Sequence, residues 1–263
     1  MKSLPENTKF AHLGKPGTAF SKGFQRRLDI LTKLVNLKDK KILDLGCGEG
    51  VWLRKFSEFT SSENVYGSDI DSESIQKALE QNTELKSFNL KVGPAESMDF
   101  ADNMFDVVFQ NEVLEHVEND EKVMRECFRV LKQRGEIIIF TPNSGWPFET
   151  HGIFLGKKYY WGNIAFLPWM PKNIYKKFAP HVRNYSNKEL LQVIDNASRF
   201  SKLDGKNYEY SITYHKHVFP GFDGMTRRFG FLGKILQRFI HNLEKTPLHY
   251  FGISHLIIIQ KLK

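Results

Sequence analysis

Residues Asp44–Gly50 read DLGCGEG and combine a carboxylate with three glycines at alternate positions. Glycine has no Cβ, so the backbone can bend tightly there and a ligand can approach it closely. The helix-forming sequence VWLRKFSEF follows at once and would direct its free N–H groups toward that ligand. These features together predict a nucleotide-type binding site at the end of a first strand.

The spacing of the glycines excludes two common nucleotide sites. A dinucleotide fingerprint reads G-x-G-x-x-G, whereas Gly46, Gly48 and Gly50 alternate and are followed by Val51. A P-loop is excluded because no Gly-Lys-Ser/Thr follows the glycines. An acidic residue, Asp69, ends the next expected strand 19 positions after Gly50. A carboxylate at that place can accept hydrogen bonds from both hydroxyls of a ribose.

The pattern D-x-G-x-G-x-G resembles motif I of class I S-adenosylmethionine-dependent methyltransferases, in particular the type 11, UbiE/UbiG-like group. The resemblance is close over roughly residues 40–143 and looser over 186–263. It implies S-adenosylmethionine as the cofactor. Where this group commonly has an aspartate that contacts the adenine amine, the chain has Pro94, which leaves adenine recognition to its neighbours. The implied cofactor-binding residues are Asp44, Gly46, Cys47, Gly48, Gly50, Asp69, Ile70, Ala95, Glu96 and Asn111.

Methyl transfer to oxygen requires an acceptor held in line with the methyl group and a group that removes its proton. His116 follows the fourth expected strand and is one catalytic candidate. The run Glu112-x-x-Glu115-His116 resembles the E-x-x-E-H run of ubiquinone-pathway O-methyltransferases, which is associated with a divalent metal. Two roles stay open for His116: a metal ligand beside the two glutamates, or a residue that shapes the pocket and acts as general base.

A second group of candidates brackets an aromatic-rich segment. Glu149 and His151 lie near its start, and His181 and Arg183 lie near its end. We expect all four to contact the acceptor, with His151 also catalytic. Two further histidines, at positions 215 and 217, alternate on an expected strand, and we expect them only to pack or to face solvent.

Strand-like and helix-like segments alternate through the first half of the chain. The expected strands are 41–45, 64–69, 88–92, 105–110 and 135–140, and the expected helices are 21–36, 51–59, 73–85 and 120–131. This alternation predicts an α/β fold, the Rossmann-like methyltransferase fold, with a doubly wound and mostly parallel sheet. Ligands then bind at the carboxyl ends of the strands.

After Asn143 the alternation stops. Residues 144–185 are rich in Trp, Tyr, Phe, Pro and Gly and are too long for an ordinary connection, which predicts a lid. Ser186 is the expected cap of a helix to Phe200, and 209–219 and 251–261 are expected strands. We therefore expect one domain with an N-terminal arm and helix (1–39), a cofactor-binding core (40–143), the lid (144–185) and a C-terminal completion of the sheet (186–263).

Residues 225–245 predict an amphipathic helix, because apolar residues recur at intervals of three and four. Five basic residues flank the apolar face: Arg227, Arg228, Lys234, Arg238 and Lys245. One hypothesis places this helix on an anionic membrane surface. The other makes it a roof over the acceptor pocket, with Phe229, Leu232, Leu236 and Phe239 buried against the lid.

Charge is unevenly divided along the 263 residues, with a formal net charge of −3 for residues 1–143 and +11 for 144–263. Such asymmetry favours an acidic partner, a membrane surface or nucleic acid. We favour a small-molecule acceptor with peripheral membrane association over a nucleic-acid partner. Two cysteines and the lack of an apolar N-terminal stretch indicate a cytoplasmic protein. The rival hypothesis is a non-catalytic, cofactor-binding partner protein that uses its basic face for RNA or protein.

Overall fold

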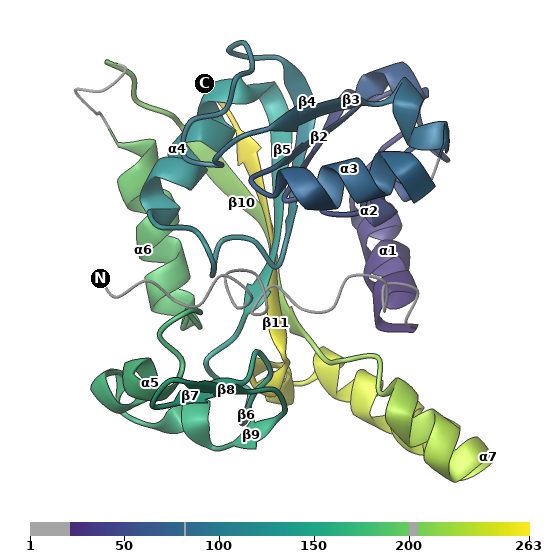
Figure 1. The fold of residues 1–263 in the computed structure, drawn as a ribbon, viewed down its shortest axis with the longest axis vertical. Helices are drawn as coiled ribbons and strands as arrows, with labels where there is room; N and C mark the ends of the chain where they lie inside the picture. Colours follow the sequence, from purple (N-terminus) through teal and green to yellow (C-terminus); the bar gives the residue numbers. More distant parts are fainter. Residues whose placement is uncertain (1–21, 82, 200–204) are drawn as a thin grey trace.

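A seven-stranded sheet forms the centre of the computed structural model, which describes residues 22–81, 83–199 and 205–263 (Figure 1). Its strand order is β3-β2-β1-β4-β5-β11-β10. The strands are β1 (Ile42–Leu45), β2 (Val65–Asp69), β3 (Asn89–Val92), β4 (Phe105–Asn111), β5 (Leu131–Pro142), β10 (Tyr210–Val218) and β11 (Ser254–Lys261). Strands β1 to β5 are parallel, and β11 is antiparallel to both of its neighbours. The predicted doubly wound, mostly parallel sheet is confirmed.

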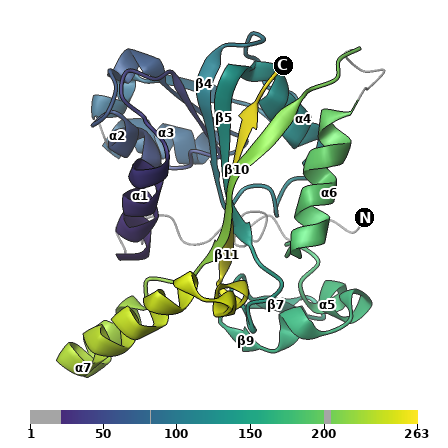
Figure 2. The ribbon, with the colours of Figure 1, turned by 180° about the vertical axis from the view of Figure 1, so that it is seen from behind.

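Helices cover both faces of the sheet, which explains why the central strands are mostly apolar. All four residues of β1 are buried, as is typical of a parallel strand with helices on each side. The helices α4 (Asp120–Val130) and α6 (Asn187–Ser198) pack on one face. The other face is covered by α1 (Lys22–Leu34), α2 (Val51–Phe56) and α3 (Ser72–Gln81). Figures 1 and 2 show these two layers from opposite sides.

Local sequence signals account for several helix ends. Ser186 caps α6 as predicted, and with Glu189 it forms a capping box in which each side chain serves the other residue's backbone N–H. Asn119 caps α4 by accepting from the N–H of Lys122. The expected helix to Leu85 ends earlier, because α3 stops at Gln81 and a 3-10 turn, η4 (Thr83–Ser87), precedes β3. The predicted N-terminal arm, residues 1–20, lies outside the described residues.

Residues 144–185 form a small lobe beyond the carboxyl end of β5, here called the lid lobe (Figure 1). It contains the strands β6 (Phe148–Glu149), β7 (Ile153–Leu155), β8 (Lys158–Tyr160) and β9 (Ile164–Ala165), the turn η5 (Leu167–Trp169) and the helix α5 (Lys172–Phe178). The lobe has its own buried cluster, formed by Leu167, Tyr175, Ala179 and Val182. The chain then returns to the sheet through α6.

Between β10 and β11 the chain leaves the sheet and forms α7 (Asp223–Asn242), followed by the turns η6 (Leu243–Lys245) and η7 (Pro247–Phe251). Figures 1 and 2 both show α7 projecting away from the lid lobe. The prediction of one continuous helix was wrong, because Gly230 takes φ 52° and ψ −121° and interrupts it. The roof hypothesis was also wrong, since Phe229, Leu232, Leu236 and Phe239 are all exposed, Leu232 to 71%.

Candidate active site

The glycine-rich loop connects β1 to α2 and is fixed to the end of β2 by backbone hydrogen bonds. The N–H groups of Gly46 and Cys47 donate to the Ser68 carbonyl, at 2.7 and 3.2 Å. Gly46 has φ +76° and Gly48 has φ +48°, a conformation that residues with a Cβ rarely adopt. A Cβ on Gly46 would lie 2.4 Å from Cγ2 of Val113, whereas a Cβ on Gly48 would meet nothing within 4 Å. The two glycines therefore serve different needs: close packing at 46 and open space at 48.

Asp69, the last residue of β2, accepts a hydrogen bond from the glycine-rich loop. Its Oδ2 accepts from the N–H of Gly48 at 2.8 Å, and its Oδ1 accepts from the N–H of Asp71 at 2.9 Å. Burial raises the pKa of this carboxyl despite those bonds. Each carboxylate oxygen has two lone pairs, so both can still accept a ligand hydroxyl. Ile70, immediately after Asp69, is 62% exposed, which leaves an apolar surface beside the carboxylate.

Asp44 is buried below the loop, and its Oδ2 has no hydrogen-bond partner among the described residues. Burial, reinforced by the charge of Asp69, raises the pKa of Asp44 well above its usual value. A buried acceptor without a donor is costly unless a ligand supplies one. The orphaned oxygen, the open space at Gly48 and the ribose-type carboxylate of Asp69 fit S-adenosylmethionine.

The remaining predicted cofactor residues contact the protein itself. Cys47 is buried, and Ala95 is half-buried. Glu96 Oε1 accepts from the N–H groups of Glu118 and Asn119, at 2.8 and 3.3 Å, and so orders the turn before α4. Asn111 Oδ1 accepts from Arg27 Nη1 at 2.6 Å. Direct contact of these side chains with the cofactor stays a prediction.

Two carboxyl groups whose pKa values shift in opposite directions follow β4. Glu112 has φ +58°, and its Oε1 binds Arg27 Nη2 of α1 at 2.6 Å. Burial alone would raise the pKa of Glu112, but the charges of Arg27 and His151 outweigh it and lower the pKa to about 2. Burial and the charge of Glu112 raise the pKa of Glu115 well above its usual range, although Thr141 Oγ1 donates to its Oε2 at 3.0 Å. Of these two neighbouring carboxyl groups, Glu112 is therefore the more acidic and Glu115 the less acidic.

The lid lobe contributes a histidine that a carboxylate orients. Glu149 Oε1 lies 3.1 Å from His151 Nδ1 and also accepts from the His151 backbone N–H at 2.7 Å. Tyr175 donates to the other oxygen of Glu149 at 2.5 Å. Burial would raise the pKa of Glu149, but the hydrogen bonds from His151 and Tyr175 lower it, so Glu149 is ionised. An ionised partner at Nδ1 favours the tautomer with Nδ1–H, which makes Nε2 of His151 a base.

Nε2 of His151 faces the residues that follow β4. It lies 3.9 Å from Glu112 Oε2, and the ring of His151 lies 5.2 Å from the ring of His116. His116 Nε2 in turn lies 3.9 Å from Glu115 Oε1. One ligand atom each of Glu115, His116 and His151 lies within 4.8 Å of the others, a set that could hold a divalent cation. The fold thus brings together His116 and His151, which are 35 positions apart in the sequence.

His181 and Arg183 make contacts that position the site. His181 Nε2 lies 3.0 Å from the His151 carbonyl oxygen, which fixes the backbone of that residue. The guanidinium of Arg183 donates to the carbonyls of Val117 and Glu118. Its backbone N–H donates to the carbonyl of Glu115. These bonds tie the end of the lid lobe to the segment after β4. Contact of either side chain with the acceptor stays a prediction.

Three residues of the site, Arg27, Thr141 and Tyr175, could not be identified from the sequence. Arg27 lies in an amphipathic helix next to the buried Leu28, and nothing in its local pattern separates it from an ordinary surface arginine. Tyr175 is one of many aromatic residues in the lid lobe. The only available signal was at Thr141, which follows the buried run at the carboxyl end of β5, where ligands bind.

Comparison with known proteins also indicates a methyltransferase. A model of the family described as "Methyltransferase domain" matches residues 36–208. Ubiquinone biosynthesis O-methyltransferase from Pseudomonas fluorescens is 34% identical over 121 residues, 44% of this chain and 50% of that protein. Phosphoethanolamine N-methyltransferase 2 from Caenorhabditis elegans is 28% identical over 127 residues, 47% of this chain and 29% of that protein. The chain thus spans half or less of the length of these two relatives.

A solved structure supports the fold over a longer range. An S-adenosylmethionine-dependent methyltransferase from Mesorhizobium loti has a TM-score of 0.60 and 15% identity, and the match covers 93% of this chain and all of that one. At that identity the likeness concerns the fold alone. The family match covers well over half of the chain and includes the glycine-rich loop, Asp69 and the carboxyl pair. The chain belongs to the methyltransferase-domain family, within the class I S-adenosylmethionine-dependent methyltransferases.

Proposed function

We propose that this protein transfers the methyl group of S-adenosylmethionine to an oxygen of a small amphipathic or lipid-like acceptor. The observation that carries the proposal is the Glu149–His151 pair, which directs a basic ring nitrogen at the residues that follow β4. The cofactor supplies a methyl carbon already activated by its sulfonium. The protein must therefore hold the acceptor in line and take its proton.

The residues of the site divide this work. His151 Nε2 accepts the hydroxyl proton as the acceptor oxygen forms its bond to the methyl carbon and the carbon–sulfur bond breaks. Glu149 stabilises the resulting imidazolium by its hydrogen bond to Nδ1. Glu112, held as a carboxylate by Arg27, adds a second negative charge 3.9 Å from Nε2.

An amine acceptor is the second candidate. Two groups near His151, the carboxylates of Glu112 and Glu149, would attract a cationic amine, and a phosphoethanolamine N-methyltransferase is among the relatives. Radiolabelled S-adenosylmethionine with a panel of acceptors separates the two candidates. We expect label to appear on an alkyl-substituted phenol or catechol and not on phosphoethanolamine. No transfer to any member of a broad panel, with the cofactor bound, would favour the non-catalytic rival.

The exposed face of α7 supports peripheral association with an anionic membrane, which would bring the enzyme to a lipid-like acceptor. Phe231 is 76% exposed, and the apolar residues on either side of it are exposed as well. Arg228, Lys234 and Arg238 are exposed on the same helix, as an interfacial helix requires. No helix among the described residues is long and apolar enough to cross a bilayer. Vesicle flotation tests this association.

A further inference from the structure

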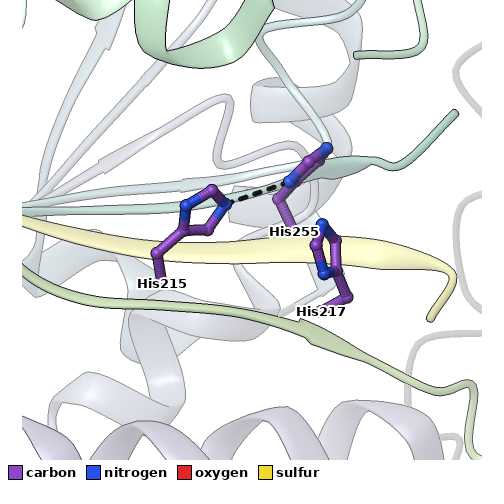
Figure 3. Close-up of side chains that lie close together, drawn as sticks. All are labelled: His215, His217 and His255. Carbon is purple, nitrogen blue, oxygen red and sulfur yellow. Dashed lines mark hydrogen bonds between the residues drawn. The ribbon is translucent and has the colours of Figure 1, made fainter. Parts of the chain in front are cut away.

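Four of the nine histidines of the chain gather where β10 ends and β11 begins, next to η7. His215 and His217 lie on β10, His255 lies opposite His217 on β11, and His249 lies in η7. Figure 3 shows the rings of His215, His217 and His255 turned toward one another. The predicted packing agrees with the burial of His217, and the structure adds that the rings of His215 and His217 meet that of His255. The proposed methyl transfer uses none of these side chains.

Hydrogen bonds at Nε2 orient the rings of His255 and His217. His255 Nε2 lies 2.8 Å from the Tyr185 carbonyl oxygen, and His217 Nε2 lies 2.7 Å from Asn187 Oδ1. Both oxygens are acceptors, so each Nε2 carries the proton and each Nδ1 carries a lone pair. Metal-binding histidines are typically held in this way, with the far ring nitrogen bound to a carbonyl or carboxylate.

The spacing of the nitrogens suits a metal ion. His255 Nδ1 lies 3.2 Å from His215 Nε2. In a tetrahedral zinc site the Zn–N bonds of about 2.0–2.1 Å put ligand nitrogens roughly 3.3 Å apart. One ring nitrogen each of His215, His217 and His255 lies within 4.8 Å of the other two, so the three residues form a group that could hold a metal ion.

We propose that His215, His217 and His255 bind one divalent transition-metal ion of the zinc class. Three imidazoles supply the protein ligands, the fourth position is left to water, and His249 lies outside the ligand set. Imidazole ligands without a carboxylate favour zinc, copper, nickel or cobalt over magnesium and calcium. When the ion binds, His215 moves its ring proton to Nδ1, so that Nε2 becomes a ligand. His217 Nδ1 exchanges its contact with His249 Nδ1 for the ion.

The position of the site indicates what the ion does. His217 stands just before residues 219–253, the excursion that carries α7, and His255 stands just after them. An ion shared by β10 and β11 therefore joins the two strands at the base of this excursion. Through Tyr185 and Asn187 the same rings are bonded to the start of α6. The ion would stabilise the edge of the sheet and fix the root of α7, because a ligand that binds only the folded state stabilises it.

The test uses the full chain without a histidine tag, stripped of metal by a chelator. Zn²⁺ binding is followed by the shift in unfolding temperature, and Co²⁺ binding by its visible absorption, which reports nitrogen ligands directly. We expect one ion per chain. His215→Gln, at a half-buried position, should weaken binding at least tenfold, and Asn187→Leu should weaken it about tenfold to a hundredfold by releasing the ring of His217.

Two controls separate this site from the others. His241→Gln changes a half-buried histidine of α7 outside the cluster and should leave the Co²⁺ spectrum unchanged. His151→Gln removes a member of the other group that could hold a metal and should also leave it unchanged. Absence of Co²⁺ absorption in the folded wild-type chain would overturn the proposal. So would a spectrum that survives His215→Gln and disappears in His151→Gln, since the ion would then lie in the active site.

Discussion

Replacing Gly46 and Gly48 in turn by alanine separates the structural from the ligand-binding role of the loop. Both glycines have positive φ, so both alanines incur the strain of a left-handed conformation, about 1–2 kcal/mol. They differ in what the new Cβ meets. At Gly46 it would lie 2.4 Å from Val113 Cγ2, and at Gly48 nothing lies within 4 Å.

The magnitudes follow from that difference. Val113 is β-branched and has little freedom at χ1, so it must move as a whole, and overpacking of this kind costs about 1–3 kcal/mol more. Gly48→Ala should therefore lower the free energy of unfolding by about 1–2 kcal/mol, and Gly46→Ala by about 2–5 kcal/mol. Gly48→Ala places its methyl group in the space assigned to the cofactor and should weaken S-adenosylhomocysteine binding at least tenfold, about 1.4 kcal/mol.

Urea unfolding of both variants measures the stability difference, and isothermal titration of Gly48→Ala with S-adenosylhomocysteine measures the affinity. Equal m-values of the variants and the wild type would show that the unfolding transitions are comparable. A Gly46→Ala variant as stable as Gly48→Ala would contradict close packing at Gly46. A Gly48→Ala variant that binds S-adenosylhomocysteine as tightly as the wild type does would contradict a cofactor site at Gly48.

Three other predictions test the proton-transfer group, the ion pair and α7. His151→Gln should lower turnover at least tenfold, about 1.4 kcal/mol in the barrier, and leave cofactor affinity within about threefold, as steady-state kinetics and titration would show. The lowered pKa of Glu112 contributes stability that is present above about pH 4 and lost as the pH falls toward 2. Arg27→Gln should remove much of this contribution, so acid unfolding of the variant should begin at a higher pH than that of the wild type. Flotation with anionic vesicles should recover the wild-type chain at low salt and lose it when Arg228 and Arg238 become Gln, since each cation near an anionic surface contributes about 1 kcal/mol; a wild-type chain that stays unbound would contradict membrane association.

The sequence was informative where the physical cause is local. The loop at Gly46–Gly50, the cap at Ser186 and the alternation of strands and helices each depend on neighbours in the chain, and the structure has all three. The position of Asp69 beside the loop was also predictable, because the carboxyl ends of adjacent parallel strands meet at one edge of the sheet.

Contacts between distant segments could not be predicted in this way. Arg27 reaches Glu112 across 85 positions, and His255 meets His215 across 40. Such pairs depend on how α1 packs on the sheet and on which residues of β10 and β11 face each other. The register of two paired strands cannot be predicted from the sequence of either strand alone. The exposure of α7 was open for a related reason, since an amphipathic pattern shows that a face is apolar but not what covers it.

The most direct test of the central claim is titration of the full chain with S-adenosylhomocysteine in a calorimeter, with an Asp69→Ala variant alongside. We predict one site per chain with a dissociation constant in the micromolar range. Binding by the variant should be at least tenfold weaker, because we expect the Asp69 carboxylate to accept the hydroxyls of the ribose. Folded protein that gives no heat with S-adenosylhomocysteine but binds a nicotinamide dinucleotide would contradict the assignment of S-adenosylmethionine as the cofactor.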